Sequence, residues 1–243
     1  MDIAHAAHRV GEALLEVAYP TRCVGCERPG QLICDDCRAQ LPWIDQRDAC
    51  PHCAAPYGTL TCTGCKHDWE TRACIAAWSS GGIATRMVTT FKDEHELRLA
   101  PVMAAAIATA LDEAQGCPAP DGTPRFDPAT TDAIAYVPAS PAAYERRGFD
   151  HMQLVATALA HELDLPLADV LVRADAHDQR ELGRVGRLEN LSGAVRVSQN
   201  VAGMDFLLVD DVITTGSSLR ACARALRARG ARSVTAAALV RVW

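Results

Sequence analysis

Eight cysteines before residue 70 form four Cys-x-x-Cys pairs, and this pattern constrains the fold more than any other feature of the chain. A Cys-x-x-Cys turn brings two thiolates to one ion, and tetrahedral zinc takes two such turns. Pairing in sequence order predicts two Zn²⁺ sites, one held by Cys23, Cys26, Cys34 and Cys37 and the other by Cys50, Cys53, Cys62 and Cys65. An interleaved arrangement that joins the first pair to the third stays open.

Cys-x-x-Cys pairs also occur at thioredoxin-like redox sites, but four regularly spaced pairs outside any βαβ pattern favour metal. The first residues contain Asp2, Glu12 and Glu16 and no continuous apolar segment, so no secretory signal is predicted. The longest apolar run, residues 102–111, is far shorter than the roughly 20 residues that cross a bilayer. We therefore expect a cytoplasmic protein without a membrane span, in which thiols stay reduced.

The cysteine-rich part and the rest of the chain differ in composition, which predicts two domains, residues 1–70 and 71–243. The first has five prolines and little apolar periodicity, so zinc rather than an apolar core has to hold it together. It carries 6 Lys and Arg against 10 Asp and Glu, a balance that disfavours autonomous binding to nucleic acid. We expect a structural or docking role for it.

From about residue 73 the chain shows apolar runs and helical periods that are typical of a helix-flanked sheet. The predicted strands are residues 133–137, 206–209 and 234–242, and the predicted helices are residues 97–111, 152–163 and 217–229. In the last helix the residues that share one apolar face are Leu219, Cys222, Ala223 and Leu226. Residues 114–131 are rich in proline and glycine, which predicts a loop.

The most informative stretch is an apolar strand that ends at Asp210 and Asp211 and continues into a turn that opens a helix. The turn consists of Thr214, Thr215, Gly216, Ser217 and Ser218. A helix N-terminus with hydroxyls and a glycine is suited to bind an anion, and the two carboxylates suit the vicinal hydroxyls of a ribose. The segment therefore predicts a site for a ribose 5-phosphate group. The alternative is a helix capped by Ser217 or Thr215 beside a solvated pair of aspartates.

These residues resemble the phosphoribosyl diphosphate (PRPP) signature of type I phosphoribosyltransferases, in which a strand, two acids and Thr-Thr-Gly-x-Ser/Thr follow one another. The whole chain resembles the ComF/GntX family through the cysteine pairs, this signature, Phe91-Lys92, Val137-Pro138, Arg146-Arg147-Gly148-Phe149, Gln179, Leu182, Arg184, Arg187 and Asn190. The resemblance implies an α/β fold: a mostly parallel phosphoribosyltransferase-like sheet flanked by helices, preceded by an N-terminal helix and a double zinc ribbon. It also implies a link to DNA uptake during natural transformation.

Carried over to this sequence, the resemblance implies that Asp210 and Asp211 contact the ribose hydroxyls and that residues 214–218 enclose the 5-phosphate. Ala139 and Ser140 correspond to the diphosphate loop. Arg146 and Arg147 lie on or beside a hood over the diphosphate, where basic side chains stabilise a leaving group that gains negative charge. On sequence alone, a solvated basic pair is the alternative for the two arginines.

Some residues depart from the family pattern. Where the family usually has Gly-Phe-Asn-Gln, this chain has Gly148-Phe149-Asp150-His151, and Ala142, Ala143 and Tyr144 stand where the family tends to be basic. An added acid and missing cations weaken the case for tight diphosphate binding. His151, His161 and His177 are candidate acid–base groups that nothing in the sequence places near the ribose.

Two functions fit these observations. The first is a phosphoribosyltransferase in which Mg²⁺-PRPP loses diphosphate as an unidentified nitrogen acceptor attacks C1 of the ribose. The second is a PRPP-binding module without catalysis that acts in DNA uptake through protein or single-stranded DNA contacts. Trp43, Trp69 and Trp78 could stack on bases, but the acidic balance opposes a broad channel for nucleic acid.

Overall fold

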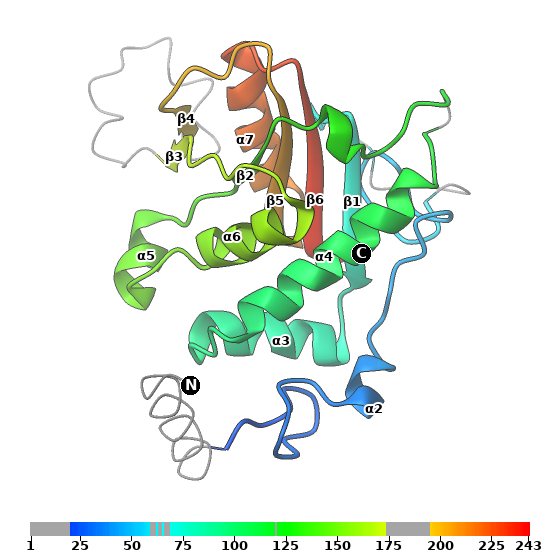
Figure 1. The fold of residues 1–243 in the computed structure, drawn as a ribbon, viewed down its shortest axis with the longest axis vertical. Helices are drawn as coiled ribbons and strands as arrows, with labels where there is room; N and C mark the ends of the chain where they lie inside the picture. Colours follow the sequence, from blue (N-terminus) through cyan, green and yellow to red (C-terminus); the bar gives the residue numbers. More distant parts are fainter. Residues whose placement is uncertain (1–19, 59–61, 63–64, 66–68, 120, 174–194) are drawn as a thin grey trace, which may run out of the picture.

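Four parallel strands form the centre of the molecule (Figure 1), in the order β1-β6-β5-β2. Their bounds are Ala73–Ser79 for β1, Ala133–Tyr136 for β2, Asp205–Ile213 for β5 and Ser233–Arg241 for β6. This computed structural model describes residues 20–58, 62, 65, 69–119, 121–173 and 195–243. The predicted α/β fold with a mostly parallel sheet is confirmed.

Helices cover both faces of the sheet. The helices α3, Gly82–Asp93, α4, Leu99–Gln115, and α6, His151–Leu163, pack on one face, and α7, Ser217–Ala228, packs on the other. The shorter elements are α2, Asp35–Arg38, the 3-10 turn η1, Pro128–Thr130, α5, Pro141–Arg147, and an antiparallel pair made of β3, Leu171–Arg173, and β4, Val195–Val197. The sheet thus separates two apolar cores.

Alternation along the strands decides which residue enters which core. In β1, Ile75 and Ala77 lie in the core under α3, α4 and α6, whereas Cys74 and Ala76 lie in the core under α7. Because both faces of the sheet are covered, its strands read as continuous apolar runs.

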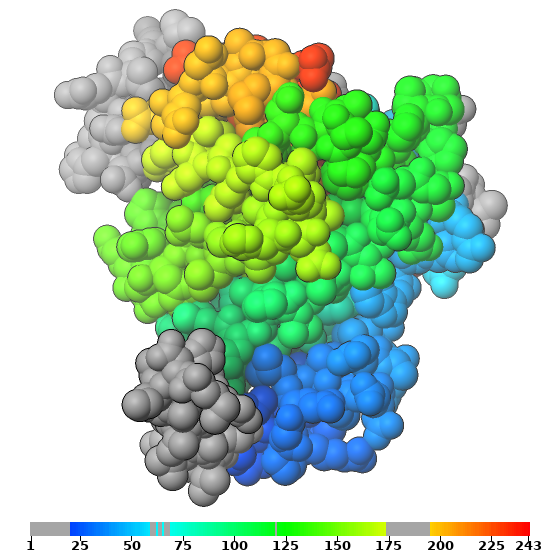
Figure 2. Space-filling view, viewed as in Figure 1, coloured from blue at the N-terminus to red at the C-terminus, as the bar shows by residue number. Residues whose placement is uncertain are grey.

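The cysteine-rich part is divided between these two cores. Its first half, residues 20–41 (the first ribbon), contributes Cys23 and Ile33 to the core of α3 and α4. Its second half, residues 45–70 (the second ribbon), contributes Cys53 and Trp69 to the core of α7. Figure 2 shows the blue first ribbon at one end of the molecule, beside the blue-green atoms of α3. The two ribbons therefore pack on opposite faces of one sheet.

The segment between the ribbons lies along the outer edge of β1. The amide of Ile44 donates to the carbonyl of Ala77 at 2.9 Å, and the amide of Ser79 donates to the carbonyl of Pro42 at 2.9 Å. A strand edge that is covered in this way cannot pair with another chain. The domain boundary predicted at residue 70 stays a prediction, and contacts join its two sides along this edge.

The regular elements predicted from apolar patterns are confirmed, with shifted ends. The strand predicted to end at Val209 continues to Ile213, because Val212 and Ile213 pair with Val240 and Arg241 of β6. Helix α4 runs four residues beyond the predicted end at Leu111, and η1 lies within the stretch predicted to be a loop. The predicted N-terminal helix and the family residues Gln179, Leu182, Arg184, Arg187 and Asn190 lie outside the described residues.

Candidate functional site

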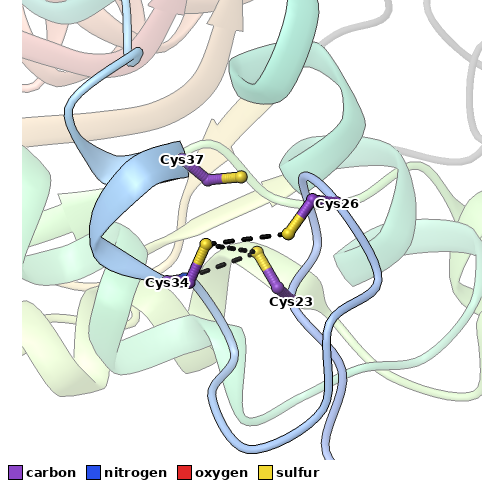
Figure 3. A group of neighbouring side chains, drawn as sticks. All are labelled: Cys23, Cys26, Cys34 and Cys37. Atoms are coloured by element: carbon purple, nitrogen blue, oxygen red, sulfur yellow. Dashed lines mark hydrogen bonds between the residues drawn. The ribbon is translucent and has the colours of Figure 1, made fainter.

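The first four cysteines converge on one point (Figure 3). The sulfur of Cys34 lies 3.6 Å from those of Cys23 and Cys26, and Cys37 completes the group from α2. All four sulfur atoms lie within 4.8 Å of one another. Sulfurs that share a tetrahedral zinc at about 2.3 Å are about 3.8 Å apart, so the group fits zinc. Gly25 is required in this turn, because a Cβ there would lie 2.6 Å from the sulfur of Cys37.

The other four cysteines form a second group of the same kind. Cys50 and Cys65 bring their sulfurs to 3.2 Å, and Cys53 and Cys62 to 3.3 Å. The sulfurs therefore group in sequence order, as predicted, and the interleaved pairing is not what the structure has. Both tetrads consist of thiols alone, which are ligands for structural zinc.

The two aspartates of β5 differ in their surroundings. The carboxylate of Asp211 is 5% exposed and accepts a hydrogen bond from Nε2 of His151 at 2.5 Å, and it forms an ion pair with Lys92. Asp210 is half-buried, and its carboxylate accepts from the amide of Asp211 at 2.9 Å. Of the two aspartates, Asp211 alone forms an ion pair with a residue that the structure describes.

These surroundings move the pKa values of the two carboxyls apart. Burial alone would raise the pKa of Asp211, but the hydrogen bond from His151 and the charge of Lys92 lower it to about 2. Burial, and then the charge of Asp211, raises the pKa of Asp210 above its ordinary value. Asp211 is thus held as an anion, whereas Asp210 takes up a proton more readily.

The turn at residues 214–218, called the 214–218 turn, leads into α7 without a side-chain cap. The cap position is Gly216, with a left-handed φ of 72°, and no side chain there bonds the helix end. The nearest substitute is a long contact of 3.4 Å from the amide of Ser217 to Oγ1 of Thr215. No side chain stands at the cap position as the alternative above required, and the N–H groups of the first turn other than that of Ser217 remain available to an anion.

The structure gives a packing reason for the glycine at position 216. A Cβ at Gly216 would lie 2.2 Å from the indole of Trp69, so the glycine is needed for close contact with a tryptophan of the second ribbon and for the positive φ.

The loop after β2 faces the acidic pair. Ser140 caps α5, and its hydroxyl accepts from the amide of Ala143 at 3.3 Å. The amide of Ala139 donates to the carboxylate of Asp150 at 2.7 Å, and Asp150 also caps α6 by accepting from Met152 at 2.9 Å. The acid that departs from the family pattern therefore occupies an amide of the predicted diphosphate loop.

One pocket of about 210 Å³ joins these parts. It is lined by Lys92, Val137, Pro138, Ala139, Ser140, Ala143, Arg147, His151, Arg173, Asp210, Asp211, Val212 and Ser218. Of the predicted site residues, it brings together the acidic pair, the residues after β2, Arg147 and Ser218. Thr214, Thr215 and Ser217 are exposed at the turn, and Arg146 is exposed and does not line the pocket.

Three residues that line this pocket were not assigned to the site from sequence: Lys92 was named only as part of the family resemblance, His151 only as a candidate acid–base group, and Arg173 not at all. Lys92 comes from α3 and His151 from the first residue of α6, and both reach Asp211. Arg173, at the end of β3, donates to the carbonyl of Pro138 at 2.9 Å and lies 3.4 Å from the hydroxyl of Ser218. His161 is exposed on α6, and His177 lies outside the described residues.

Two of the three tryptophans proposed to stack on bases are not available for it. Trp69 and Trp78 are 5% and 1% exposed, and Trp43 is half exposed with its ring edge-on to Trp78 at 5.5 Å. No helix within the described ranges has the length and apolar character needed to cross a bilayer.

Two family models match the chain in sequence order. A double zinc ribbon domain matches residues 14–75, and a phosphoribosyl transferase domain matches residues 153–242. The second match contains most of α6 and all of β5, the 214–218 turn, α7 and β6. The chain thus combines a double zinc ribbon with a phosphoribosyltransferase domain.

Curated relatives match nearly the full length. The DNA utilization protein YhgH of Salmonella typhi is 29% identical over 93% of this chain and 97% of its own. Competence protein ComFC of Bacillus subtilis is 28% identical over 88% and 86%, and competence protein F of Haemophilus influenzae is 25% identical over 90% and 96%. In domain order and along nearly its full length, the chain is thus similar to competence and DNA utilization proteins, in line with its resemblance to the ComF/GntX family.

Among solved structures, a hypoxanthine phosphoribosyltransferase from Staphylococcus aureus matches with a TM-score of 0.30 and 13% identity. The match covers 60% of this chain and 64% of that one, less than two thirds, and a likeness of this size carries no weight here.

Proposed function

We propose that this chain binds PRPP with Mg²⁺ in the pocket beside β5 and transfers its phosphoribosyl group to a nitrogen acceptor. The observation that carries the proposal is that one pocket joins an acidic pair to an uncapped helix N-terminus and to three cationic side chains. Asp210 and Asp211 take the ribose hydroxyls, and Thr214, Thr215, Gly216, Ser217 and Ser218 enclose the 5-phosphate. Asp210 supports this role because it lines the pocket and, within the described residues, forms no ion pair.

The diphosphate of PRPP is placed on the other side of the pocket. Ala139 and Ser140 supply the loop, and Arg147 and Arg173 supply charge that a phosphate group binds well. Arg146, which is exposed, reaches the diphosphate only if the loop after β2 moves. Mg²⁺ would accompany PRPP, for which phosphate and carboxylate oxygens are suitable ligands.

In the transfer, the acceptor nitrogen forms a bond to C1 of the ribose while the bond from C1 to the diphosphate oxygen breaks. The diphosphate leaves with the bonding electrons, and the acceptor nitrogen loses its proton to solvent or to the diphosphate. Positive charge grows on the ribose ring during this step, so the carboxylates of β5 stabilise the transition state more than the bound substrate.

Calorimetry with PRPP and Mg²⁺ tests the binding. Ribose 5-phosphate and nucleoside monophosphates should compete with PRPP, because they carry the group that the 214–218 turn binds, and free ribose should not compete. Absence of any heat with PRPP, or competition by free ribose, would refute the proposed site.

A second function is favoured by one specific observation, the hydrogen bond from Ala139 to Asp150. A loop amide that is already occupied leaves fewer donors for a diphosphate, which fits a module that binds the ligand without turning it over. A diphosphate-release assay across nucleobases and amines separates the two. If the protein is a transferase, replacing Asp210 and Asp211 by asparagine should reduce turnover by a larger factor than affinity; release of no diphosphate with any acceptor would favour the module.

The names of the relatives concern competence and DNA utilization, and we place this chain in the same process. Its partners there would be single-stranded DNA or proteins of DNA uptake, on the cytoplasmic side. A deletion strain should then take up or use external DNA less well, and complementation by a variant with Asp210 and Asp211 replaced would show whether the pocket is needed.

A further inference from the structure

The second ribbon is in direct contact with the 214–218 turn. The indole of Trp69 fills the space beside Gly216, where even a Cβ would be 2.2 Å from its ring. The guanidinium of Arg220, on the first turn of α7, lies 5.9 Å above the same ring, and Arg224 forms an ion pair with Glu70 at 3.2 Å. A side chain four residues after the last cysteine of the second tetrad is therefore packed under the turn.

A buried arginine makes a second connection between the two. Arg241, at the end of β6, is 5% exposed, and its Nε donates to the carbonyl of Cys53 at 2.8 Å. Its terminal nitrogen donates to the carbonyls of Thr214 at 2.7 Å and Ile213 at 3.2 Å. One side chain thus bonds the backbone of a cysteine of the tetrad to the backbone where the turn begins.

The first ribbon has a matching arginine that leads elsewhere. Arg86 of α3 donates to the carbonyl of Gly25, inside the first knuckle, at 2.8 Å, but this arginine is exposed and on the opposite face of the sheet. In each ribbon, the carbonyl of a residue in a Cys-x-x-Cys turn therefore accepts a hydrogen bond from an arginine outside the ribbon. Of these two arginines, Arg241 also contacts the 214–218 turn and Arg86 does not.

We propose that zinc at the Cys50, Cys53, Cys62 and Cys65 tetrad holds the 214–218 turn in its binding conformation through Trp69 and Arg241, which act as positioning residues. Zinc at the first tetrad has no such effect. The proposal takes the identity of the ligand from the function proposed above. The order of the turn itself can be measured without a ligand. Coupling between two sites is reciprocal, so a ligand bound to the 214–218 turn must also raise the affinity of the second tetrad for zinc.

The chain offers a matched pair of variants to test this. Cys34→Ser and Cys62→Ser each change the first cysteine of the second knuckle of a tetrad, and both positions are half-buried. Each protein should lose about one zinc per chain. Hydrogen exchange followed by mass spectrometry then reports on a peptide that spans residues 206–219. Exchange there should rise in Cys62→Ser and stay at the level of the wild type in Cys34→Ser; equal exchange in both variants would overturn the proposal.

A second set of variants keeps all cysteines, in case the loss of a ligand disturbs folding. Arg241→Lys retains the charge but cannot bond two separate backbone segments, and Arg86→Lys is its control. Trp69→Ala empties the space beside Gly216, which the six-membered ring of the indole fills, whereas Trp69→Phe keeps one aromatic ring and loses the second ring together with an indole N–H that has no hydrogen-bond partner in the described part of the chain. Exchange of the 206–219 peptide should rise in Arg241→Lys and Trp69→Ala with both zinc ions still bound. If it does not rise, the proposal is wrong.

The same proteins show whether the ligand is coupled to the metal. PRPP with Mg²⁺ should bind Cys62→Ser about tenfold more weakly than the wild type, and Cys34→Ser with nearly unchanged affinity. In the reverse direction, PRPP should slow the transfer of the remaining zinc to a chelator in Cys34→Ser but not in Cys62→Ser. If the wild type binds no PRPP, the proposed function fails while the exchange result still decides this inference. If the wild type binds and both variants bind equally well, only the inference fails.

Discussion

The two ribbons have the same ligands and similar spacing, yet they occupy different positions in the molecule. The first packs on the face of α3 and α4 and contributes no residue to the lining of the pocket. The second packs on the face of α7 and contacts the 214–218 turn, which leads into that helix. Sequence alone cannot make this distinction, because it depends on which face of the sheet each ribbon meets.

This difference indicates that a zinc site has to be judged by what it packs against as well as by its ligands. The tetrad of the first ribbon lies beside α3, whereas the second ribbon packs against the turn that contributes Ser218 to the pocket wall. Each of the following predictions changes one side of this comparison and leaves the other in place.

Removal of both zinc ions should have the largest effect. Metal analysis of protein never exposed to chelator should find about two zinc ions per chain, and structural zinc in small domains contributes about 10–16 kcal/mol of folding free energy. Chelation should unfold both ribbons while circular dichroism shows that the helices of the sheet domain remain. One zinc or none, or a single cooperative loss of all structure, would contradict the division between ribbons and sheet.

Replacement of the two knuckle-binding arginines should separate the ribbons by stability. Arg241→Met leaves the buried carbonyls of Cys53, Ile213 and Thr214 without this donor and should lower the free energy of unfolding by about 3 kcal/mol. Arg86→Met changes an exposed contact and should cost about 0.5 kcal/mol or less. Urea denaturation of the zinc-loaded proteins measures both, and equal losses would mean that the two ribbons are attached alike.

The comparison also shows what could be predicted from sequence. The helix α7 and its buried face were predictable because Leu219, Cys222, Ala223 and Leu226 repeat at a helical period. The acidic pair and the 214–218 turn were predictable because they are contiguous. The tetrads were predictable because two knuckles with a short loop between them have few ways to meet one ion.

The rest depended on tertiary packing. Lys92, His151 and Arg173 come from three different elements, and only the sheet order brings them to the end of β5. Gly216 was singled out as part of the predicted anion site, but its close neighbour in the structure is Trp69, which is distant in sequence. Asp150 could be recognised as an unusual acid, although its bond to Ala139 could not be foreseen.

We expect the buried ion pair between Lys92 and Asp211 to stabilise the folded protein more than the exposed ion pair of the first ribbon does. The pKa of Asp211 is lowered from 3.8 to about 2, so the group stabilises the folded protein above pH 3.8, and this contribution is lost as the pH falls toward 2. It is worth about 2 kcal/mol. Without Lys92, the hydrogen bond from His151 still lowers the pKa of Asp211, so the pKa should rise part of the way and part of this stabilisation should be lost.

We therefore expect Lys92→Met to lower the free energy of unfolding by about 1 kcal/mol at pH 7, with the difference from wild type shrinking as the pH falls from 4 to 2. Zinc loss in acid is common to both proteins and cancels in the difference. The control is Arg28→Met, which breaks the pair with Asp36 in the first ribbon, where both side chains are more than two-thirds exposed, and should change little. A difference that does not depend on pH would show that Lys92 stabilises by packing instead.

The smallest effect is expected at Asp150, on the side of the pocket away from the second ribbon. Its carboxylate accepts from Ala139 with one oxygen and caps α6 with the other. Asparagine keeps an oxygen for the cap but turns a donor toward the amide of Ala139, so this amide should become free for a diphosphate. One negative charge near the diphosphate also disappears. Asp150→Asn should therefore bind PRPP about threefold more tightly, with little change for ribose 5-phosphate, which has no diphosphate.

Calorimetry with the two ligands measures this, and Asp164→Asn, at the other end of α6, is the control, because asparagine tolerates the left-handed conformation of that residue. An equal gain for both ligands would mean that the charge acts on the whole pocket rather than on the diphosphate side. The result also sharpens the comparison of the ribbons. If the second ribbon acts on the 5-phosphate end and Asp150 on the diphosphate end, their effects on PRPP affinity should add in the Asp150→Asn, Cys62→Ser double variant. Failure to add would show that the two ends of the pocket are coupled and that the influence of the second ribbon extends across it.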